Sequence, residues 1–247
     1  MNILNKTLAA FFFAGAAAAS SAATVTITFD NPIFNGSGYD DVKIFFPSAS
    51  GHGTTNENVL AGRFQGTASD VVGVPTSIFV DGLNDLYMYC YDVYESINDG
   101  QVVKYTINLD GEKDRTRDFI GAVNAVLNAG KSSFDQFAWL HPASGAQGAA
   151  IQLGIWESLY EASGWDIASG SFRATGLDTT TSSWLNSFLG QIDSSASIDK
   201  KYVMTLEAAG AQDMIAGDPP AAVPEPASIA LLGLGLAAIA VTRKRKA

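Results

Sequence analysis

The chain has a single cysteine, Cys90, and only two histidines among its 247 residues. A lone cysteine cannot form an internal disulfide, so this is not a small domain held together by disulfides. His52 stands in a Gly/Thr loop and His141 precedes Pro142, and neither has the spaced His, Cys or Asp/Glu partners of a zinc site. A Gly-x-Ser-x-Gly elbow and a phosphate-binding glycine loop are also missing. We therefore expect no metal site and no cofactor.

Positive charge is scarce between residues 24 and 224. This stretch holds ten basic and twenty-four acidic residues, which gives a formal net charge of −14. Such a surface repels nucleic acids and anionic lipids, so we expect neither as a partner. The other five basic residues lie at the two ends, as Lys6 and the cluster over 243–246.

The first 23 residues have the layout of a secretory signal peptide. Lys6 supplies a positive charge, an apolar stretch runs over 8–19, and small residues close it. We expect cleavage just after Ala22 or Ala23, which makes the mature chain an exported protein. The alternative is an N-terminal membrane anchor, but the apolar run is short for a span and ends in small residues.

The C-terminal end has four parts in order. They are a linker over 218–222, Val223 with Pro224-Glu225-Pro226, an apolar run over 227–241, and the basic cluster Arg243-Lys244-Arg245-Lys246. As a helix the apolar run is roughly 22 Å long, at about 1.5 Å per residue. A bilayer core needs about 30 Å, so the run is a marginal membrane segment unless flanking residues contribute. The basic cluster should stay cytoplasmic and leave the body of the protein outside.

This order resembles the PEP-CTERM sorting signal of Gram-negative bacteria, with Pro224, Glu225 and Pro226 as its motif. The resemblance implies that an exosortase-type sorting enzyme processes the tail during export. The segment over 227–241 would then anchor the chain in the inner membrane only transiently, before the protein reaches the cell surface or the extracellular matrix. A plain tail anchor is the alternative interpretation.

Hydrophobic periodicity predicts an α+β domain over 24–217. Alternating and β-branched runs predict strands at 25–29, 42–46, 59–66, 77–80, 86–94, 102–109 and 201–206. Helical spacing predicts helices at 114–128, 134–140, 149–162 and 182–189. We therefore expect a β-sheet or barrel-like core built from the N- and C-terminal strands, with an inserted helical region.

Two residues of this domain stand in unusual places. In the strand over 86–94, Cys90 shares a face with Leu86 and Met88, so the thiol points into an apolar layer. Gln152 lies within the apolar stripe of the helix over 149–162, where an unpartnered amide costs about 1–3 kcal/mol. Each has an ordinary explanation, as a small buried hydrophobe and as a glutamine bonded to a neighbouring backbone.

The two oddities explain each other if Cys90 and Gln152 meet in the fold. A thiolate that attacks the carboxamide carbon releases ammonia and forms an internal thioester. The buried glutamine then no longer needs partners for its amide nitrogen, and the exported cysteine is no longer free.

The same residues carry a second resemblance. Tyr89-Cys90 resembles the aromatic-Cys motif of bacterial thioester domains, and the segment over 151–156 resembles their apolar-Gln-x-x-apolar-Trp motif. The flanking segments 137–140 and 165–172 are similar to the PEP-CTERM branch of that family, so the resemblance covers roughly 79–189.

The resemblance to thioester domains implies a function and a set of site residues. Cys90 and Gln152 would form the thioester cross-link, supported by four neighbours, Tyr89, Ile151, Ile155 and Trp156. The protein would act in adhesion, by covalent attachment to a partner that bears a lysine amine, without turnover and therefore not as an enzyme. The alternative is a non-covalent structural or carbohydrate-associated matrix protein in which Cys90 and Gln152 are core residues.

Overall fold

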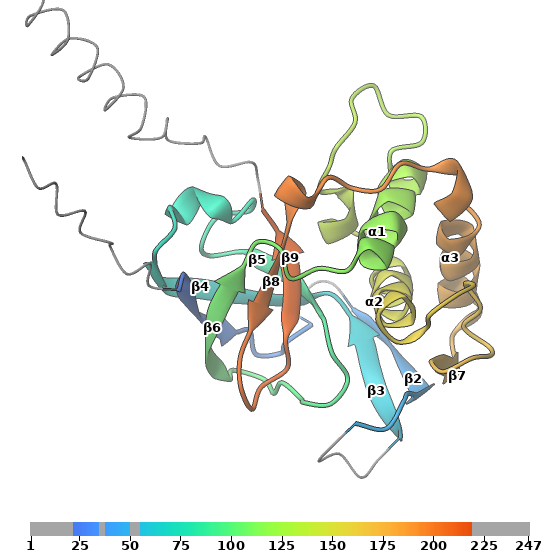
Figure 1. Ribbon diagram of the computed structural model, residues 1–247, viewed down its shortest axis with the longest axis horizontal. Coiled ribbons are helices and arrows are strands. Elements are labelled where there is room, and N and C mark those ends of the chain that lie inside the picture. Colours follow the sequence, from blue (N-terminus) through green and yellow to red (C-terminus); the bar gives the residue numbers. More distant parts are fainter. Residues whose placement is uncertain (1–21, 35–37, 50–54, 219–247) are drawn as a thin grey trace, which may run out of the picture.

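The structure is a computed structural model that describes residues 22–34, 38–49 and 55–218 (Figure 1). The predicted signal peptide up to residue 21, the sorting motif and the apolar run over 227–241 lie outside the described residues. Within the described ranges, every helix is too short or too polar to cross a membrane.

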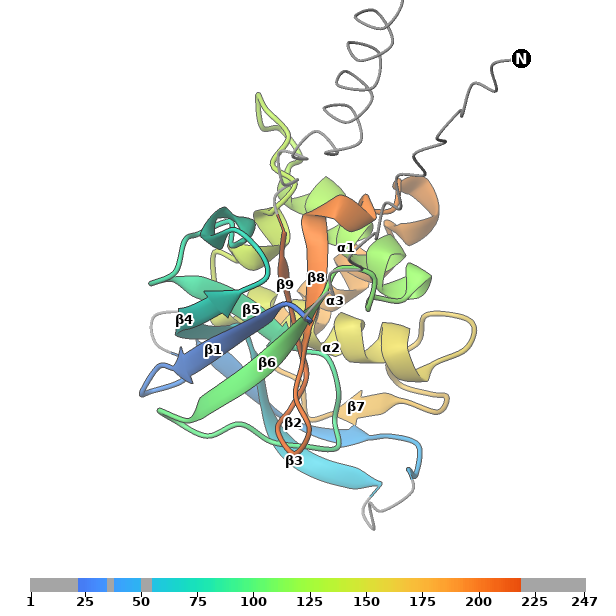
Figure 2. The same cartoon turned by 60° about the vertical axis from the view of Figure 1, so that its left-hand side comes forward.

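Six antiparallel strands close into a barrel in the order β1-β4-β5-β9-β8-β6 (Figure 2). They are β1 (Thr24–Phe29), β4 (Phe64–Val72), β5 (Leu86–Cys90), β6 (Val102–Asn108), β8 (Val203–Glu207) and β9 (Met214–Gly217). In β1 the side chains of Val25, Ile27 and Phe29 are buried and alternate with more exposed threonines. With this two-residue period, one face of the strand points into the barrel core.

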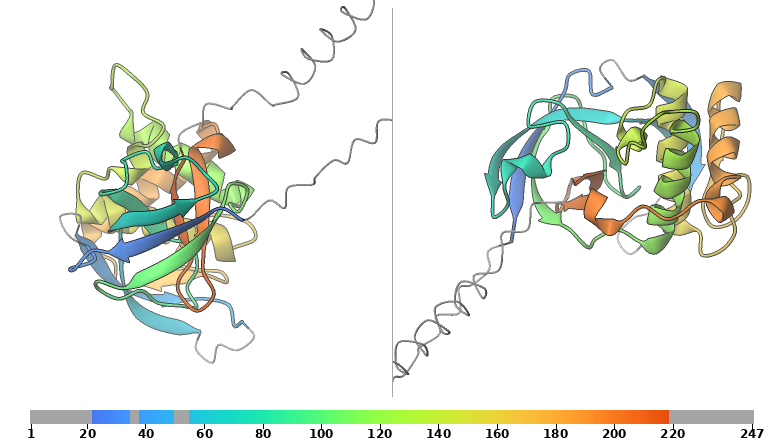
Figure 3. Two further views of the ribbon diagram at one scale, coloured as in Figure 1. Left: turned by 90° about the vertical axis from the view of Figure 1, so that its left-hand side faces the viewer. Right: turned by 90° about the horizontal axis from the view of Figure 1, so that it is seen from above.

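A second sheet and three helices form the other half of the molecule, beside the barrel (Figure 3). The sheet has the order β3-β2-β7, with β3 at Asn56–Gly62, β2 at Tyr39–Phe45 and β7 at Arg173–Thr175. The helices are α1 (Asp114–Leu127), α2 (Gly145–Tyr160) and α3 (Thr179–Leu189). Short 3₁₀ turns lie at Thr76–Ile78, Ala138–Leu140, Ile192–Ser194 and Lys200–Tyr202.

Helix α2 is the central element of this half, because α1, α3, β2 and β3 all contact it. Every residue from Gln147 to Leu159 is buried, as expected for a helix that is apolar on all sides. Ser144 begins the helix by accepting a hydrogen bond from the Gln147 N–H. At Gly154 the missing side chain lets the Phe119 ring of α1 approach closely, since an added Cβ would lie 1.9 Å from that ring.

The α+β prediction with a barrel-like core is confirmed, whereas several element predictions are wrong in detail. The run over 77–80 is not a strand, because its first two residues belong to the 3₁₀ turn at Thr76–Ile78. So short an apolar run does not decide between strand and turn. The run over 59–66 is split at Arg63 into β3 and β4, which belong to different sheets. Strands β7 and β9 were not predicted.

Candidate functional site

Cys90 is the last residue of β5, at a point where the strand has a neighbour on only one side. On that side Cys90 pairs with Met214 of β9, and the Tyr91 N–H continues this ladder to the Asp213 carbonyl. On the other side the pairing with β4 stops at Met88, opposite Phe64. The backbone N–H and C=O of Cys90 point toward this vacant position, where a buried pair must find other partners.

The side chain of Gln152, from α2, supplies those partners. Its Oε1 accepts a hydrogen bond from the Cys90 N–H at 2.8 Å, and its Nε2 donates to the Cys90 carbonyl at 2.9 Å. The amide therefore takes the place of a neighbouring strand. Because each of its ends meets a backbone group of fixed polarity, the orientation of the amide is determined. Gln152 is fully buried, so the contact is shielded from water.

The thiol of Cys90 makes a separate contact, with a residue of the β8–β9 hairpin. Its S–H donates to Oε1 of Gln212, with 2.9 Å between sulfur and oxygen. Burial raises the pKa of the Cys90 thiol well above its usual value, and the negative charge of Asp92 raises it further. At neutral pH the thiol is therefore protonated, which keeps it a hydrogen-bond donor.

Asp92 ties the loop after β5 to the surrounding elements. Its backbone carbonyl accepts two hydrogen bonds, from Gln212 Nε2 at 2.9 Å and from Trp156 Nε1 at 3.0 Å. Its carboxylate accepts the backbone N–H groups of Tyr94, Glu95 and Asp213. Burial nevertheless raises the pKa of Asp92 to about 6, against the lowering effect of these donors.

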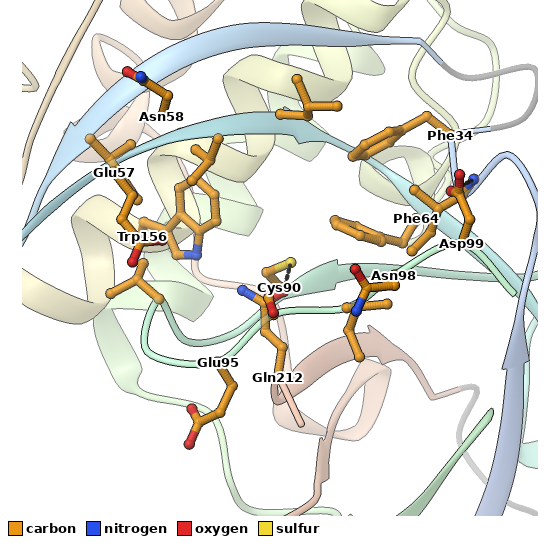
Figure 4. A pocket seen from close by; sticks show the side chains of 17 residues that line it. Phe34, Glu57, Asn58, Phe64, Cys90, Glu95, Asn98, Asp99, Trp156 and Gln212 are labelled. Atoms are coloured by element: carbon orange, nitrogen blue, oxygen red, sulfur yellow. Dashed lines mark hydrogen bonds between the residues drawn. The ribbon is translucent and has the colours of Figure 1, made fainter. Parts of the chain in front are cut away.

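A cavity of about 370 Å³ opens beside the thiol (Figure 4). Cys90, Trp156 and Gln212 line its inner part, and Phe34 and Phe64 lie across from Trp156. Three carboxylates also line it, Glu57, Glu95 and Asp99, and no lysine, arginine or histidine is among its described lining residues. This volume is in the range of ligand-binding pockets, and the acidic lining favours a cation.

Three of the four predicted supporting residues do not line the cavity. Tyr89 stacks on Trp139 with 5.8 Å between ring centroids, and its hydroxyl donates a hydrogen bond to the Trp139 carbonyl at 3.0 Å. Ile151 and Ile155 are completely buried on α2. Only Trp156 of the four lines the cavity.

The two hydrogen bonds place the carboxamide of Gln152 beside the residue that carries the thiol. A nucleophile attacks a carbonyl carbon from above or below the plane of its amide. The Cys90 N–H already donates to the oxygen that becomes negative during such an attack.

Sequence reasoning missed Gln212 and Asp92. Both flank strand ends, and Gln212 precedes the apolar run of β9, which is only four residues long. The sequence shows only a glutamine shortly before a short apolar run, and its burial becomes visible in the structure alone. The described residues contain no cluster of His, Cys, Asp and Glu that could hold a metal ion.

One family model matches the chain, and it matches the C-terminal end. It is described as the PEP-CTERM protein-sorting motif and covers residues 222–246. Comparison with the curated proteins and with the solved structures gives no match. The chain therefore carries a PEP-CTERM sorting motif, which marks it as an exported protein that an exosortase recognises and whose C-terminal tail is processed.

Proposed function

We propose that the exported domain attaches covalently to amine-bearing partners through an internal thioester between Cys90 and Gln152. The observation that carries the proposal is the pair of hydrogen bonds between the Gln152 amide and the backbone of Cys90, next to a cavity that the same cysteine lines. The attachment would take place at the cell surface or in the matrix, after the tail has served as a transient inner-membrane anchor and been removed.

Formation of the thioester needs no outside reactant. The Cys90 sulfur bonds to the Gln152 side-chain carbonyl carbon, the carbon–nitrogen bond breaks, and ammonia leaves with the thiol proton. The Cys90 N–H stabilises the developing oxyanion, and the Cys90 carbonyl holds the departing nitrogen until the bond breaks. The raised pKa of the thiol makes free thiolate rare, so the proton must pass to the leaving nitrogen as the bonds change.

Attachment is the reverse exchange with a different amine. The nitrogen of a lysine side chain, in its neutral form, attacks the thioester carbonyl, the carbon–sulfur bond breaks, and the amine proton returns to sulfur. The product is a secondary amide on Gln152 and a free Cys90 thiol. The carboxylates at Glu57, Glu95 and Asp99 would concentrate cationic side chains at the cavity before attack.

The alternative is a structural matrix protein without covalent chemistry. It is favoured by the fact that the Gln152 amide already satisfies both backbone groups of Cys90, so its burial has a purely structural explanation. The cavity and its acidic lining have no role in that account.

Reaction with methylamine separates the two functions. The mature domain, residues 24–217, is incubated with methylamine, unfolded, alkylated and digested with trypsin. The peptide over 132–173 holds Gln136, Gln147 and Gln152, so fragmentation shows which glutamine carries the label. We expect one methylamide, on Gln152, and a newly alkylated Cys90 in the peptide over 64–104.

Two matched variants control this experiment. Gln152→Glu and Gln147→Glu make the same change on the same helix, but only Gln152 contacts Cys90. We expect the first to abolish labelling and the second to leave it intact, and Cys90→Ala to behave as the first. Labelling spread over several glutamines, or none in the wild type, would support the structural alternative.

A further inference from the structure

Gln212 is a buried amide whose oxygen points at the reactive sulfur. It lies between β8 and β9, is 7% exposed, and lines the cavity beside Cys90 (Figure 4). The thioester resemblance assigns it no role. Among the described residues, the only hydrogen-bond partner of its Oε1 is the Cys90 thiol.

Its orientation is fixed by its surroundings. Nε2 donates to the Asp92 carbonyl at 2.9 Å, and that carbonyl can only accept. The hydroxyl of Tyr105 donates to the Gln212 backbone carbonyl at 3.0 Å and holds the residue from the barrel side. The oxygen of the side chain must therefore face Cys90.

Thioester formation removes the donor that Gln212 Oε1 uses. The S–H proton leaves with ammonia, and a thioester sulfur has no hydrogen to donate. A buried carbonyl oxygen without a donor is unfavourable, so in the thioester state this oxygen is a vacant acceptor beside the cavity. An N–H or O–H group that enters the cavity can fill it.

We propose that Gln212 is the positioning residue that binds the attacking amine, an inference that rests on the proposed thioester. A primary amine keeps two hydrogens on nitrogen after it attacks the carbonyl carbon. One is donated to Gln212 Oε1, and the other passes to the departing Cys90 sulfur. The product thiol then regains the hydrogen bond to Gln212. A secondary amine has a single hydrogen for both tasks, so the site prefers primary amines.

The test compares Gln212→Met, which keeps the approximate size but removes the acceptor, with Gln191→Met at a half-buried glutamine outside the cavity. Intact mass gives the extent of thioester formation. Rates of reaction with methylamine and dimethylamine then give the preference for primary amines. We expect Gln212→Met to form the thioester, to react with methylamine at least about tenfold more slowly, and to lose most of the preference. Gln191→Met should match the wild type.

A merely structural role for Gln212 would slow both amines by the same factor, and an unchanged ratio overturns the inference. A Gln212→Met protein that reacts with methylamine as fast as the wild type does not contradict the thioester function, but it also overturns the inference. A folded Gln212→Met protein with full sequence mass overturns it too, because Gln212 then acts in forming the bond. Gln212→Leu also removes the acceptor and should lose most of the preference for primary amines, so it tests the inference if the methionine variant does not fold. A wild-type protein that forms no thioester ends both proposals.

Discussion

The Gln152 side chain binds the backbone of Cys90 as a neighbouring strand would, through hydrogen bonds of 2.8 and 2.9 Å. The contact joins the central helix of one half of the molecule to the barrel of the other. It exists because β4 begins at Phe64, opposite Met88, and so leaves the last residue of β5 without a strand partner on that side. A glutamine that fills this position for structural reasons also brings its carboxamide next to Cys90.

Trp156 is expected to protect the thioester. Its ring lines the cavity, and its Nε1 holds the Asp92 carbonyl that also anchors Gln212. Trp156→Phe should keep the apolar wall and the thioester, with modestly faster hydrolysis. Trp156→Ala should admit water and hydrolyse at least about tenfold faster, which corresponds to about 1.4 kcal/mol of lost protection. Intact mass followed over time in amine-free buffer gives both rates, and equal rates in all three proteins would contradict this role.

The free Cys90 thiol is expected to be unreactive in the folded protein. It is 2% exposed, and burial followed by the Asp92 charge raises its pKa. After methylamine treatment, native protein should react with a disulfide reagent at pH 8 at least about tenfold more slowly than free cysteine, since the thiolate is the reactive form. Guanidinium should release one thiol per chain at once. Immediate reaction of the native protein would show that the thiol is open to solvent.

Gly154 is expected to be intolerant of any side chain. The Cβ of alanine would lie 1.9 Å from the Phe119 ring, and both residues lie between packed helices. Gly154→Ala should lower the free energy of unfolding by about 1–3 kcal/mol, despite a gain of up to about 1 kcal/mol in helix propensity. Gly148→Ala is the matched control on α2, because its Cβ would meet nothing closer than 3.5 Å. Urea unfolding of both variants tests the difference, and equal stabilities would contradict the packing account.

Glu157 is expected to make the domain less stable as pH rises. It is completely buried, its Oε2 lacks a hydrogen-bond partner among the described residues, and burial raises its pKa from 4.5 to about 7. The neutral acid is therefore favoured in the folded state. Its contribution is complete below about pH 4.5 and is lost as pH rises through 7, a change of up to roughly 3 kcal/mol.

Glu157→Gln isolates this contribution from other acids that titrate in the same window, because Asp92 and Asp218 also have raised pKa values, of about 6 and about 7. The variant should show a smaller loss of unfolding free energy than the wild type between pH 5 and pH 8. Parallel curves for the two proteins in urea unfolding would show that Glu157 does not titrate in this range.

Most of the barrel strands and the three helices could be anticipated because their signals are local, and the pairing of Cys90 with Gln152 because each residue is unusual in its own segment. Alternating residues predict β1. The amide of Gln152 is unusual in an apolar helix stripe, and the thiol of Cys90 is unusual as the single cysteine of an exported chain. The form of the pairing could not be anticipated, because the Cys90 groups that bind Gln152 are backbone atoms, which every residue has. What selects them is the start of β4 at Phe64, opposite Met88, which is a non-local feature of strand register.

The contact of Gln212 with Cys90 could not be predicted for a similar reason. It lies 122 positions from Cys90 along the chain, and barrel closure through β9 brings the two together. Four residues of strand carry too little periodicity to predict that closure. The apolar stripe predicts one buried face for α2. In the structure the sheet of β2 and β3 also covers the helix, so that every residue from Gln147 to Leu159 is buried.

The intact mass of the purified mature domain, measured without reducing agent or amines, tests the central claim most directly. The account predicts a mass lower than that of the sequence by one ammonia, with no thiol released on unfolding unless an amine has been added. Cys90→Ala and Gln152→Glu should each have the full mass of their own sequences. A wild-type protein with its full sequence mass and one free thiol would contradict the thioester and leave Gln152 as a structural partner of β5.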